Sequence, residues 1–381
     1  MTAKSFTYLV SRYGILLVAC MWLISTLIYL WIHGVVTELE AAKYIGEAHQ
    51  YINTGSFSAP RFYFYCATIF IMVFAIKINI GMWGAFAIQA LLNLFAYLIF
   101  YKALHKIFQS VFTPILITFY LLAFSPYQSW VVFLYTESVF FSSILILISV
   151  LILYKPVNLK NILVIFLALF FTFVSRPLGI LFVFGVYLYF FYTAPTRWKI
   201  AIACSSVLLV VVSYFLINIA FASVHDWTIT QGFEEESIIC DMPSSPPYQK
   251  LDLDRTGSPV YQLWYYLFHN FSHFLQFAGI KLQYFFLMTR NYYSNLHNYF
   301  LLLNVIPVYL LAVYSLFTRR KYFGREIIVF ITSTILIYAL AIVFQCDDYH
   351  NRFVLSIYPL FVLLAARTAE HFILPAFKNN K

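Results

Sequence analysis

Thr37 to Ser58 reads TELEAAKYIGEAHQYINTGSFS and directly follows a long apolar run, Tyr13 to Val36. A run of that length and composition predicts a helix that spans a membrane. The segment after it is the first polar stretch of the chain, and its residues recur at helical spacing. The two stretches together predict a membrane span followed by a short amphipathic helix at the membrane surface.

The predicted surface helix has two distinct faces. One face carries Glu40, Tyr44, Glu47 and Tyr51, and the other carries Ala41, Ile45, Ala48 and Ile52. Thr37 with Glu40 three residues later is the capping-box pattern, and Gly55 supplies a stop. One interpretation is a solvated interfacial helix. The alternative is that Glu40 faces an active site at the membrane surface.

The composition of the whole chain excludes an ordinary soluble domain. Of 381 residues, 62% are hydrophobic and only 10% are charged. Repeated long apolar runs predict an all-α polytopic membrane protein with a single integral-membrane domain over residues 1–381. The net charge of +9 does not predict nucleic-acid binding, because most Lys and Arg form short clusters between the apolar runs, where they set membrane topology.

The basic clusters predict about ten spans with both termini in the cytoplasm. We expect spans near 13–36, 82–101, 111–126, 137–154, 161–175, 178–193, 200–222, 299–317, 327–344 and 353–370. Arg319, Arg320, Lys321 and Arg325 form the strongest inside marker. Residues 37–60 are then the first outer loop, and residues 223–298 are a large outer loop with amphipathic segments. The segment 61–80 is apolar but broken at Lys77 and Asn79, and we favour a re-entrant or interfacial position for it.

This topology gathers the acidic residues on the outer face. They include Glu40, Glu47, Glu137, Asp347, Asp348 and the acids within 234–241. Arg176 and Arg352 lie at outer span ends, where the positive-inside rule does not explain them. An Arg in such a place needs an anionic partner, which is either a phosphate or a carboxylate of a nearby loop.

Three local patterns resemble membrane glycosyltransferases of the GT-C fold. Glu40, Tyr44 and Gly55 in the first outer loop resemble the first-loop signature of family 39, although that signature has Asp where this chain has Glu40. Ser125-Pro126 followed by Tyr135-Thr136-Glu137-Ser138, and then Ser175 to Gly179, is similar to segments of the PIG-V-type GPI mannosyltransferases. Arg352-Phe353 followed by Tyr358-Pro359-Leu360 is similar to a motif near the end of many GT-C enzymes.

The resemblance implies a GT-C-like bundle and a transferase that moves a sugar from a polyprenyl-phosphate donor to a lipid, glycan or protein acceptor. The protein would lie in the cytoplasmic (inner) membrane among its lipids, with the active site facing the exterior. A single displacement with one base would invert the anomeric centre. The alternatives are a polysaccharide or lipid transporter (flippase) and an O-antigen polymerase-like protein. No inverted repeat or nucleotide-binding motif is present.

Each candidate residue has a role that its chemistry suits. A carboxylate should take the proton of the acceptor hydroxyl, and Glu40 is the first candidate, with Glu47 and Glu137 behind it. Cations should stabilise the leaving phosphate, and the candidates are Arg352, Arg176 and His350. Tyr44 and Tyr349 are candidates for stacking on sugar, although membrane-interface anchors have the same pattern.

Metal and disulfide chemistry remain open in the sequence. The acids at 234–241 with Asp347 and Asp348 permit a divalent cation, but no spacing requires one, and we assign no metal and no cofactor. Cys240 and Cys346 both fall in predicted outer loops, so they would pair in an oxidising compartment if the two loops lie close together.

Overall fold

The computed structural model describes residues 3–222, 229–240, 251–317 and 323–378, and every regular element in these ranges is a helix. In chain order they are α1 (Ala3–His33), α2 (Glu40–Thr54), η1 (Pro60–Tyr65), α3 (Cys66–Lys77), α4 (Gly81–Ile107), α5 (Phe112–Ala123), α6 (Ser125–Gln128), η2 (Ser129–Val132), α7 (Thr136–Leu153), α8 (Leu159–Ser175), η3 (Pro177–Gly179), α9 (Ile180–Thr193), α10 (Thr196–Ala222), α11 (Gln231–Glu234), α12 (Pro259–His269), α13 (Phe271–Leu287), α14 (Asn295–Phe317), α15 (Arg325–Phe344), η4 (Tyr349–Asn351) and α16 (Arg352–Lys378). Asp241 and the basic residues 319–321 lie outside the described ranges.

The chain divides into two compact units, each built from separate parts of the sequence. Unit 1 consists of Met1–Val186, Pro307–Ile331 and Leu355–Lys381. Unit 2 consists of Tyr187–Ile306 and Thr332–Val354. The prediction of a single integral-membrane domain over residues 1–381 stays a prediction.

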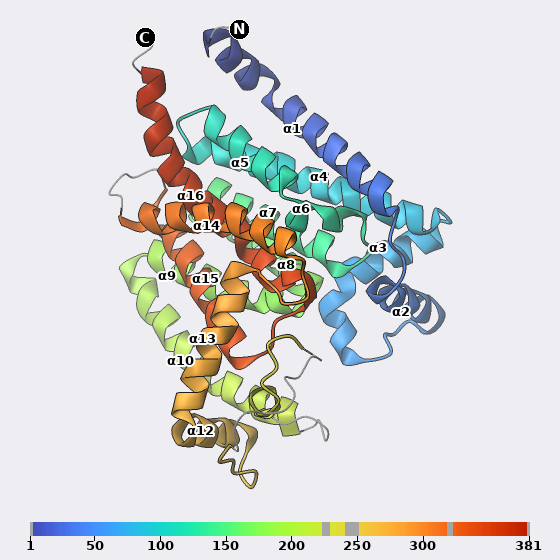
Figure 1. Ribbon diagram of the computed structural model, residues 1–381, viewed down its shortest axis with the longest axis vertical. Coiled ribbons are helices and arrows are strands. Elements are labelled where there is room, and N and C mark those ends of the chain that lie inside the picture. Colours follow the sequence, from blue (N-terminus) through green and yellow to red (C-terminus); the bar gives the residue numbers. More distant parts are fainter. Residues whose placement is uncertain (1–2, 223–228, 241–250, 318–322, 379–381) are drawn as a thin grey trace. The chain divides into compact units, whose positions relative to one another are not determined.

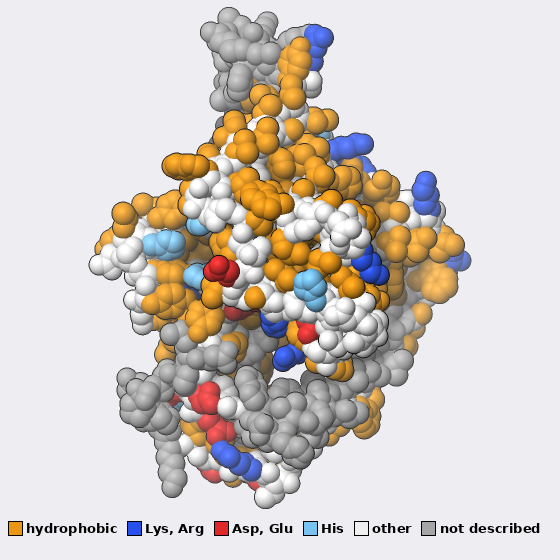
Figure 2. Space-filling view, turned by 90° about the vertical axis from the view of Figure 1, so that its right-hand side faces the viewer, with side chains coloured by type: hydrophobic (Ala, Val, Ile, Leu, Met, Phe, Trp, Pro, Cys, Tyr) orange, Lys and Arg blue, Asp and Glu red, His pale blue; other side chains and the backbone are white. Residues whose placement is uncertain are grey.

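Several helices have the length and apolar composition of membrane spans. Seven qualify among the described residues, or up to eight if the bent pair Phe112–Ala123 and Ser125–Val132 is one span. Hydrophobic side chains also make up much of the described surface in Figure 2. The chain is therefore an all-helical membrane protein, as its apolar runs predict. Pro60–Lys77 is one of the seven, so this segment is long and apolar enough to cross a membrane fully.

The centre of unit 1 is α7, which packs against α4 and α8 and is buried on nearly all sides. A buried polar network joins it to its neighbours. Asn93 on α4 accepts a hydrogen bond from the Trp22 indole at 2.8 Å and donates one to the Ser142 hydroxyl at 3.1 Å. Gln128 donates to the same Asn93 oxygen at 3.2 Å. Away from water, polar contacts of this kind fix which helices pack together, and they link α1, α4 and α7.

The segment between α5 and α7 differs from the sequence prediction. The sequence predicts a span at about 111–126 and an outer loop at 127–136. In the structure, α5 ends at Ala123, and the chain turns by 72° into the short helices α6 and η2. Tyr127, Trp130 and Val132 of this segment are buried. Pro126 favours the bend, because it cannot continue a preceding helix, and the apolar side chains that follow cover α1, α4 and α7.

Helix α2 confirms the helix predicted after the first apolar run but corrects how it starts. The residue before it is Leu39 with φ of 55°, and no side chain caps the helix, so the predicted capping box of Thr37 and Glu40 is wrong. The positive φ at Leu39 turns the chain so that Thr37 is out of register for a cap. The predicted stop is confirmed, because Gly55 has φ of 74° and its N–H donates to the Tyr51 carbonyl at 2.9 Å.

Unit 2 contains a small aromatic core of its own. Phe233 on α11, Tyr266 on α12 and Phe277 on α13 pack together, and the Phe233 and Tyr266 ring centres lie 4.6 Å apart in a stacked arrangement. Helix α12 also packs on α10 (Figure 1). The large outer loop predicted over 223–298 is therefore helical in its second half, in agreement with its amphipathic pattern.

Candidate functional site

Two segments far apart in sequence are hydrogen-bonded together in unit 1. The Val36 N–H donates to the Val132 carbonyl at 3.0 Å, and the Leu134 N–H donates to the Val36 carbonyl at 3.1 Å. The Gln89 side chain on α4 donates to the carbonyls of Val131 and Phe133 at 2.9 and 2.8 Å. These bonds satisfy backbone groups that have no helical partner. They fix the chain just before α2 beside the chain just before α7.

Glu40 and Tyr44 form the first part of the candidate site. The Tyr44 hydroxyl donates to a Glu40 carboxylate oxygen at 2.8 Å. Tyr44 is only 1% exposed, while Glu40 at the start of α2 is partly exposed. Burial raises the pKa of Tyr44 well above its ordinary value, and the charges of Glu40 and Glu137 raise it further. Tyr44 therefore keeps its proton and orients Glu40 as a hydrogen-bond donor.

Glu137 and Arg176 form the second part as a buried ion pair. Glu137 opens α7 and is fully buried, and the Arg176 guanidinium donates to its carboxylate. One of the two partners predicted for Arg176, a carboxylate, is therefore present. The next residues explain the position of Arg176, because α8 ends before it and a Cβ at Gly179 would lie 2.3 Å from the Thr172 carbonyl oxygen. Only glycine allows that close return of the chain.

The two parts influence one another electrostatically. The charges of Glu40 and Glu137 raise the pKa of Tyr44 and that of Arg176 lowers it, so all three lie within electrostatic reach of this phenol. The Lys43 ammonium lies 5.3 Å from the centre of the Tyr44 ring. The structure thus brings together four of the residues predicted from sequence, from three separate segments of unit 1.

Glu47 has a different environment from Glu40. One of its carboxylate oxygens accepts a hydrogen bond from the Ser58 N–H at 3.0 Å, and the other accepts from the Ser58 hydroxyl. Glu47 is buried on α2 and ties the end of the first loop back to the helix. Glu47 therefore stabilises the fold of the first loop, whereas the Glu40 side chain is partly exposed to solvent.

Unit 2 holds the remaining predicted residues next to an ion pair that sequence reasoning missed. Arg290 is only 1% exposed and donates to the Asp347 carboxylate at 2.5 Å. Burial raises the pKa of Asp347 to about 6, and the Arg290 charge opposes that rise. The isolated Arg290 in an aromatic segment was the available signal, because a cation in such surroundings needs a partner.

The turn before α16 carries three of the predicted residues. Arg352 lies 3.7 Å from Asp348, and Asp348 accepts a hydrogen bond from the Tyr349 N–H at 2.7 Å. His350 and Asn351 have φ of 58° and 59°, which is uncommon for residues other than glycine. The Asn351 amide donates to the Met288 carbonyl at 2.7 Å and secures this turn. Tyr349 remains partly exposed.

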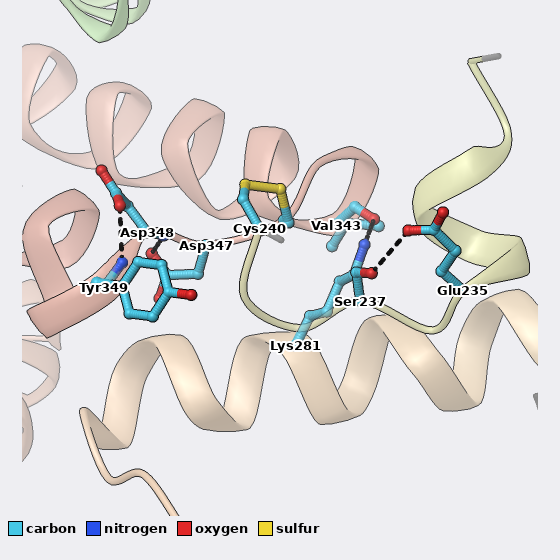
Figure 3. Close-up of a disulfide and its surroundings, with 9 residues drawn as sticks. Glu235, Ser237, Cys240, Lys281, Val343, Asp347, Asp348 and Tyr349 are labelled. Carbon is cyan, nitrogen blue, oxygen red and sulfur yellow. Dashed lines mark hydrogen bonds between the residues drawn. A yellow bond between two sulfur atoms is a disulfide. The ribbon is translucent and has the colours of Figure 1, made fainter. Parts of the chain in front are cut away.

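A disulfide joins Cys240 and Cys346, so the pairing that the sequence left open is formed. Their Cα atoms lie 5.0 Å apart, within the usual range. The backbone bonds from the Cys240 N–H to the Asp347 carbonyl and from the Asp347 N–H to the Ile238 carbonyl run beside it. Figure 3 shows this junction, with Asp347 and Asp348 directly after the disulfide.

Lys281 lies buried below the same junction. Its ammonium donates to the Val343 carbonyl at 3.5 Å (Figure 3). It also lies 4.8 and 4.4 Å from the ring centres of Phe233 and Phe277. Burial lowers the pKa of Lys281 to about 7, because a charged ammonium loses its hydration there.

No protein-family model, curated protein or solved structure matches this sequence. The functional argument therefore depends on the residues themselves. Glu40, Tyr44, Glu137 and Arg176 meet in unit 1, whereas Tyr349, His350 and Arg352 belong to unit 2. Within the described ranges, no three His, Cys, Asp or Glu side chains group as metal ligands would.

Proposed function

We propose that this protein is a membrane glycosyltransferase that transfers a sugar from a polyprenyl-phosphate donor to an acceptor on the extracytoplasmic face. The observation that carries the proposal is the group of Glu40, Tyr44, Glu137 and Arg176. It combines a partly exposed carboxylate (Glu40), a buried phenol that orients it (Tyr44) and a buried ion pair of Glu137 with Arg176. A GT-C-like bundle of about ten spans in a cytoplasmic membrane, with this end outward, belongs to the same proposal.

The proposed reaction assigns Glu40 the role of general base. The acceptor hydroxyl oxygen forms a bond to the anomeric carbon as the bond from that carbon to the phosphate oxygen breaks. The lipid phosphate leaves with the bonding electrons, and Glu40 takes the hydroxyl proton. Tyr44 holds the carboxylate by its hydrogen bond of 2.8 Å. Displacement on one face inverts the anomeric centre.

The negative phosphate requires a cation, and the candidate among the residues grouped with Glu40 in unit 1 is Arg176. Arg176 donates to the Glu137 carboxylate, and Arg352 of unit 2, which lies 3.7 Å from Asp348, is a separate candidate for binding a phosphate. A planar guanidinium suits phosphate, because it donates two parallel hydrogen bonds. Donor, acceptor and membrane lipids are the partners in this proposal.

The test is transfer of radiolabelled sugar from a panel of polyprenyl-phosphate sugars by membranes that contain the protein. Glu40→Gln keeps the size and hydrogen-bonding ability of the side chain but cannot take a proton. We expect it to lower transfer by about 10²- to 10⁴-fold. Glu38→Gln is the matched control, since Glu38 is an exposed carboxylate of the same loop, and it should retain transfer.

Two results would count against the proposal. Transfer at the wild-type rate by Glu40→Gln would remove Glu40 as the base. Absence of transfer from every donor, with the protein folded and inserted, would favour a transporter or a polymerase instead.

A further inference from the structure

A polar pocket lies at the end of α13 and the start of α14 in unit 2. Its volume is about 170 Å³. Its lining residues all carry a hydroxyl, amide or guanidinium group: Gln283, Tyr284, Thr289, Arg290, Asn291 and Asn298. A water needs about 15 Å³ by the same kind of measure, so the pocket has room for a small polar ligand. Pockets for apolar ligands are lined mainly by hydrophobic side chains, and this one is not.

The pocket wall is held in place by its own hydrogen bonds. Helix α13 ends at Leu287, and the chain turns at the next residue, Met288, whose φ is 60°. The Asn298 side chain then accepts from the Arg290 N–H at 3.1 Å and donates to the Arg290 carbonyl at 3.0 Å. The Tyr284 hydroxyl donates to the Asn291 side-chain oxygen at 3.1 Å. A ligand would therefore meet groups that are already ordered, which lowers the entropic cost of binding.

The charge of the pocket is balanced before any ligand arrives. The Arg290 guanidinium donates to Asp347 at 2.5 Å and to the carbonyls of Tyr284 and Thr289 at 2.7 and 3.1 Å. Its buried Nε–H has no hydrogen-bond partner within the described residues. Because Asp347 neutralises the guanidinium, the pocket has no uncompensated positive charge to attract a phosphate, so it suits a neutral ligand.

We propose that this pocket binds one ring of a neutral sugar. Each sugar hydroxyl both donates and accepts a hydrogen bond, and the side-chain amides of Gln283 and Asn291 offer both kinds of group. This inference rests on the proposed transferase function. The donor carries a phosphate, so a pocket for a neutral sugar would bind the acceptor, which is then a neutral glycan. The pocket itself requires only that a sugar binds.

The experiment measures binding of methyl glycosides of neutral hexoses to the purified full-length protein in detergent, by ligand-observed NMR titration. We expect at least one methyl glycoside to bind in the millimolar range, and inorganic phosphate not to displace it. Gln283→Ala should weaken binding about fivefold through the lost hydrogen bonds. Gln276→Ala is the matched control, since Gln276 is also exposed on α13 but does not line the pocket, and it should bind as wild type does. Asn291→Ala provides a second variant from the loop.

Three results would overturn the inference: no methyl glycoside binds, phosphate displaces the glycoside, or Gln283→Ala and Gln276→Ala bind equally. The binding assay uses no donor and no turnover. Glycoside binding by a protein that transfers no sugar would therefore reject the transferase and retain the pocket. Sugar transfer by a protein that binds no glycoside would reject the pocket proposal and retain the transferase.

Discussion

The Glu137–Arg176 pair is a residue-scale feature with a measurable effect on stability. Both side chains are buried, so the removal of one leaves the other as an uncompensated charge. We predict that Arg176→Ala lowers the free energy of unfolding by about 3–5 kcal/mol. Thermal unfolding in detergent measures this change. Arg61→Ala, at an exposed arginine, should shift unfolding little, and equal shifts for the two variants would contradict the prediction.

Lys281 makes stability depend on pH in a defined direction. Its pKa is about 7 in the folded protein and 10.5 ordinarily. Between these values the unfolded chain binds more protons than the folded one, so the free energy of unfolding rises with pH. We predict that Lys281→Met raises the unfolding temperature near pH 7 and flattens the rise between pH 7 and 9.

The control for Lys281 is an exposed lysine. Lys102→Met, on α4, should leave the pH profile of unfolding as in wild type. A wild-type profile that stays flat from pH 7 to 9, or that Lys281→Met leaves unchanged, would show that the buried ammonium does not control this dependence.

At the scale of the element, two glycines of α2 give opposite predictions. Gly55 ends the helix with φ of 74°, and Gly46 lies inside it, and a Cβ would meet no atom within 4 Å at either position. Steric clashes with neighbouring atoms therefore do not contribute to the effect of either substitution. Gly55→Ala should destabilise by about 1 kcal/mol because alanine resists positive φ, whereas Gly46→Ala should stabilise by up to about 1 kcal/mol. Thermal unfolding of both variants tests this, and shifts of the same sign would contradict it.

The elements were largely predictable, but their ends and contacts were not. Apolar runs predicted α1, α4, α7, α14 and α15, because a membrane span needs a long apolar stretch. The start of α2 was wrong because a positive φ at Leu39 leaves no sequence signal. The burial of the segment around Trp130 depends on packing against other helices, which its own residues do not encode.

At the scale of the molecule, a disulfide links the two sequence segments of unit 2, and cysteine labelling can test it. Cys240 and Cys346 are linked, and the three free cysteines are Cys20, Cys66 and Cys204. We predict that the denatured, unreduced protein takes up three maleimide labels and the reduced protein five, measured by intact mass. The Cys240→Ser variant should expose Cys346 and take up four labels without reduction. Five labels on the unreduced wild type would contradict the disulfide.

The candidate site illustrates why sequence reasoning reaches only part of a molecule. Glu40, Tyr44, Glu137 and Arg176 were identified because each is a polar residue at an apolar boundary, which is visible locally. The Arg290–Asp347 pair was missed because its members are separated in sequence, and nothing local to either residue indicates the other as its partner. Pairing across such a distance is a property of tertiary packing.

The composition of unit 2 has a consequence for how the protein is made. Its two sequence segments are separated by residues 307–331, which belong to unit 1, and its disulfide connects one segment to the other. During synthesis, Cys240 emerges long before Cys346. Unit 2 therefore remains incomplete, and Cys240 remains a free thiol, until nearly the whole chain has been inserted. Over that interval the thiol of Cys240 is open to mispairing, so the yield of correctly assembled protein should depend on the thiol-oxidising machinery of the host cell.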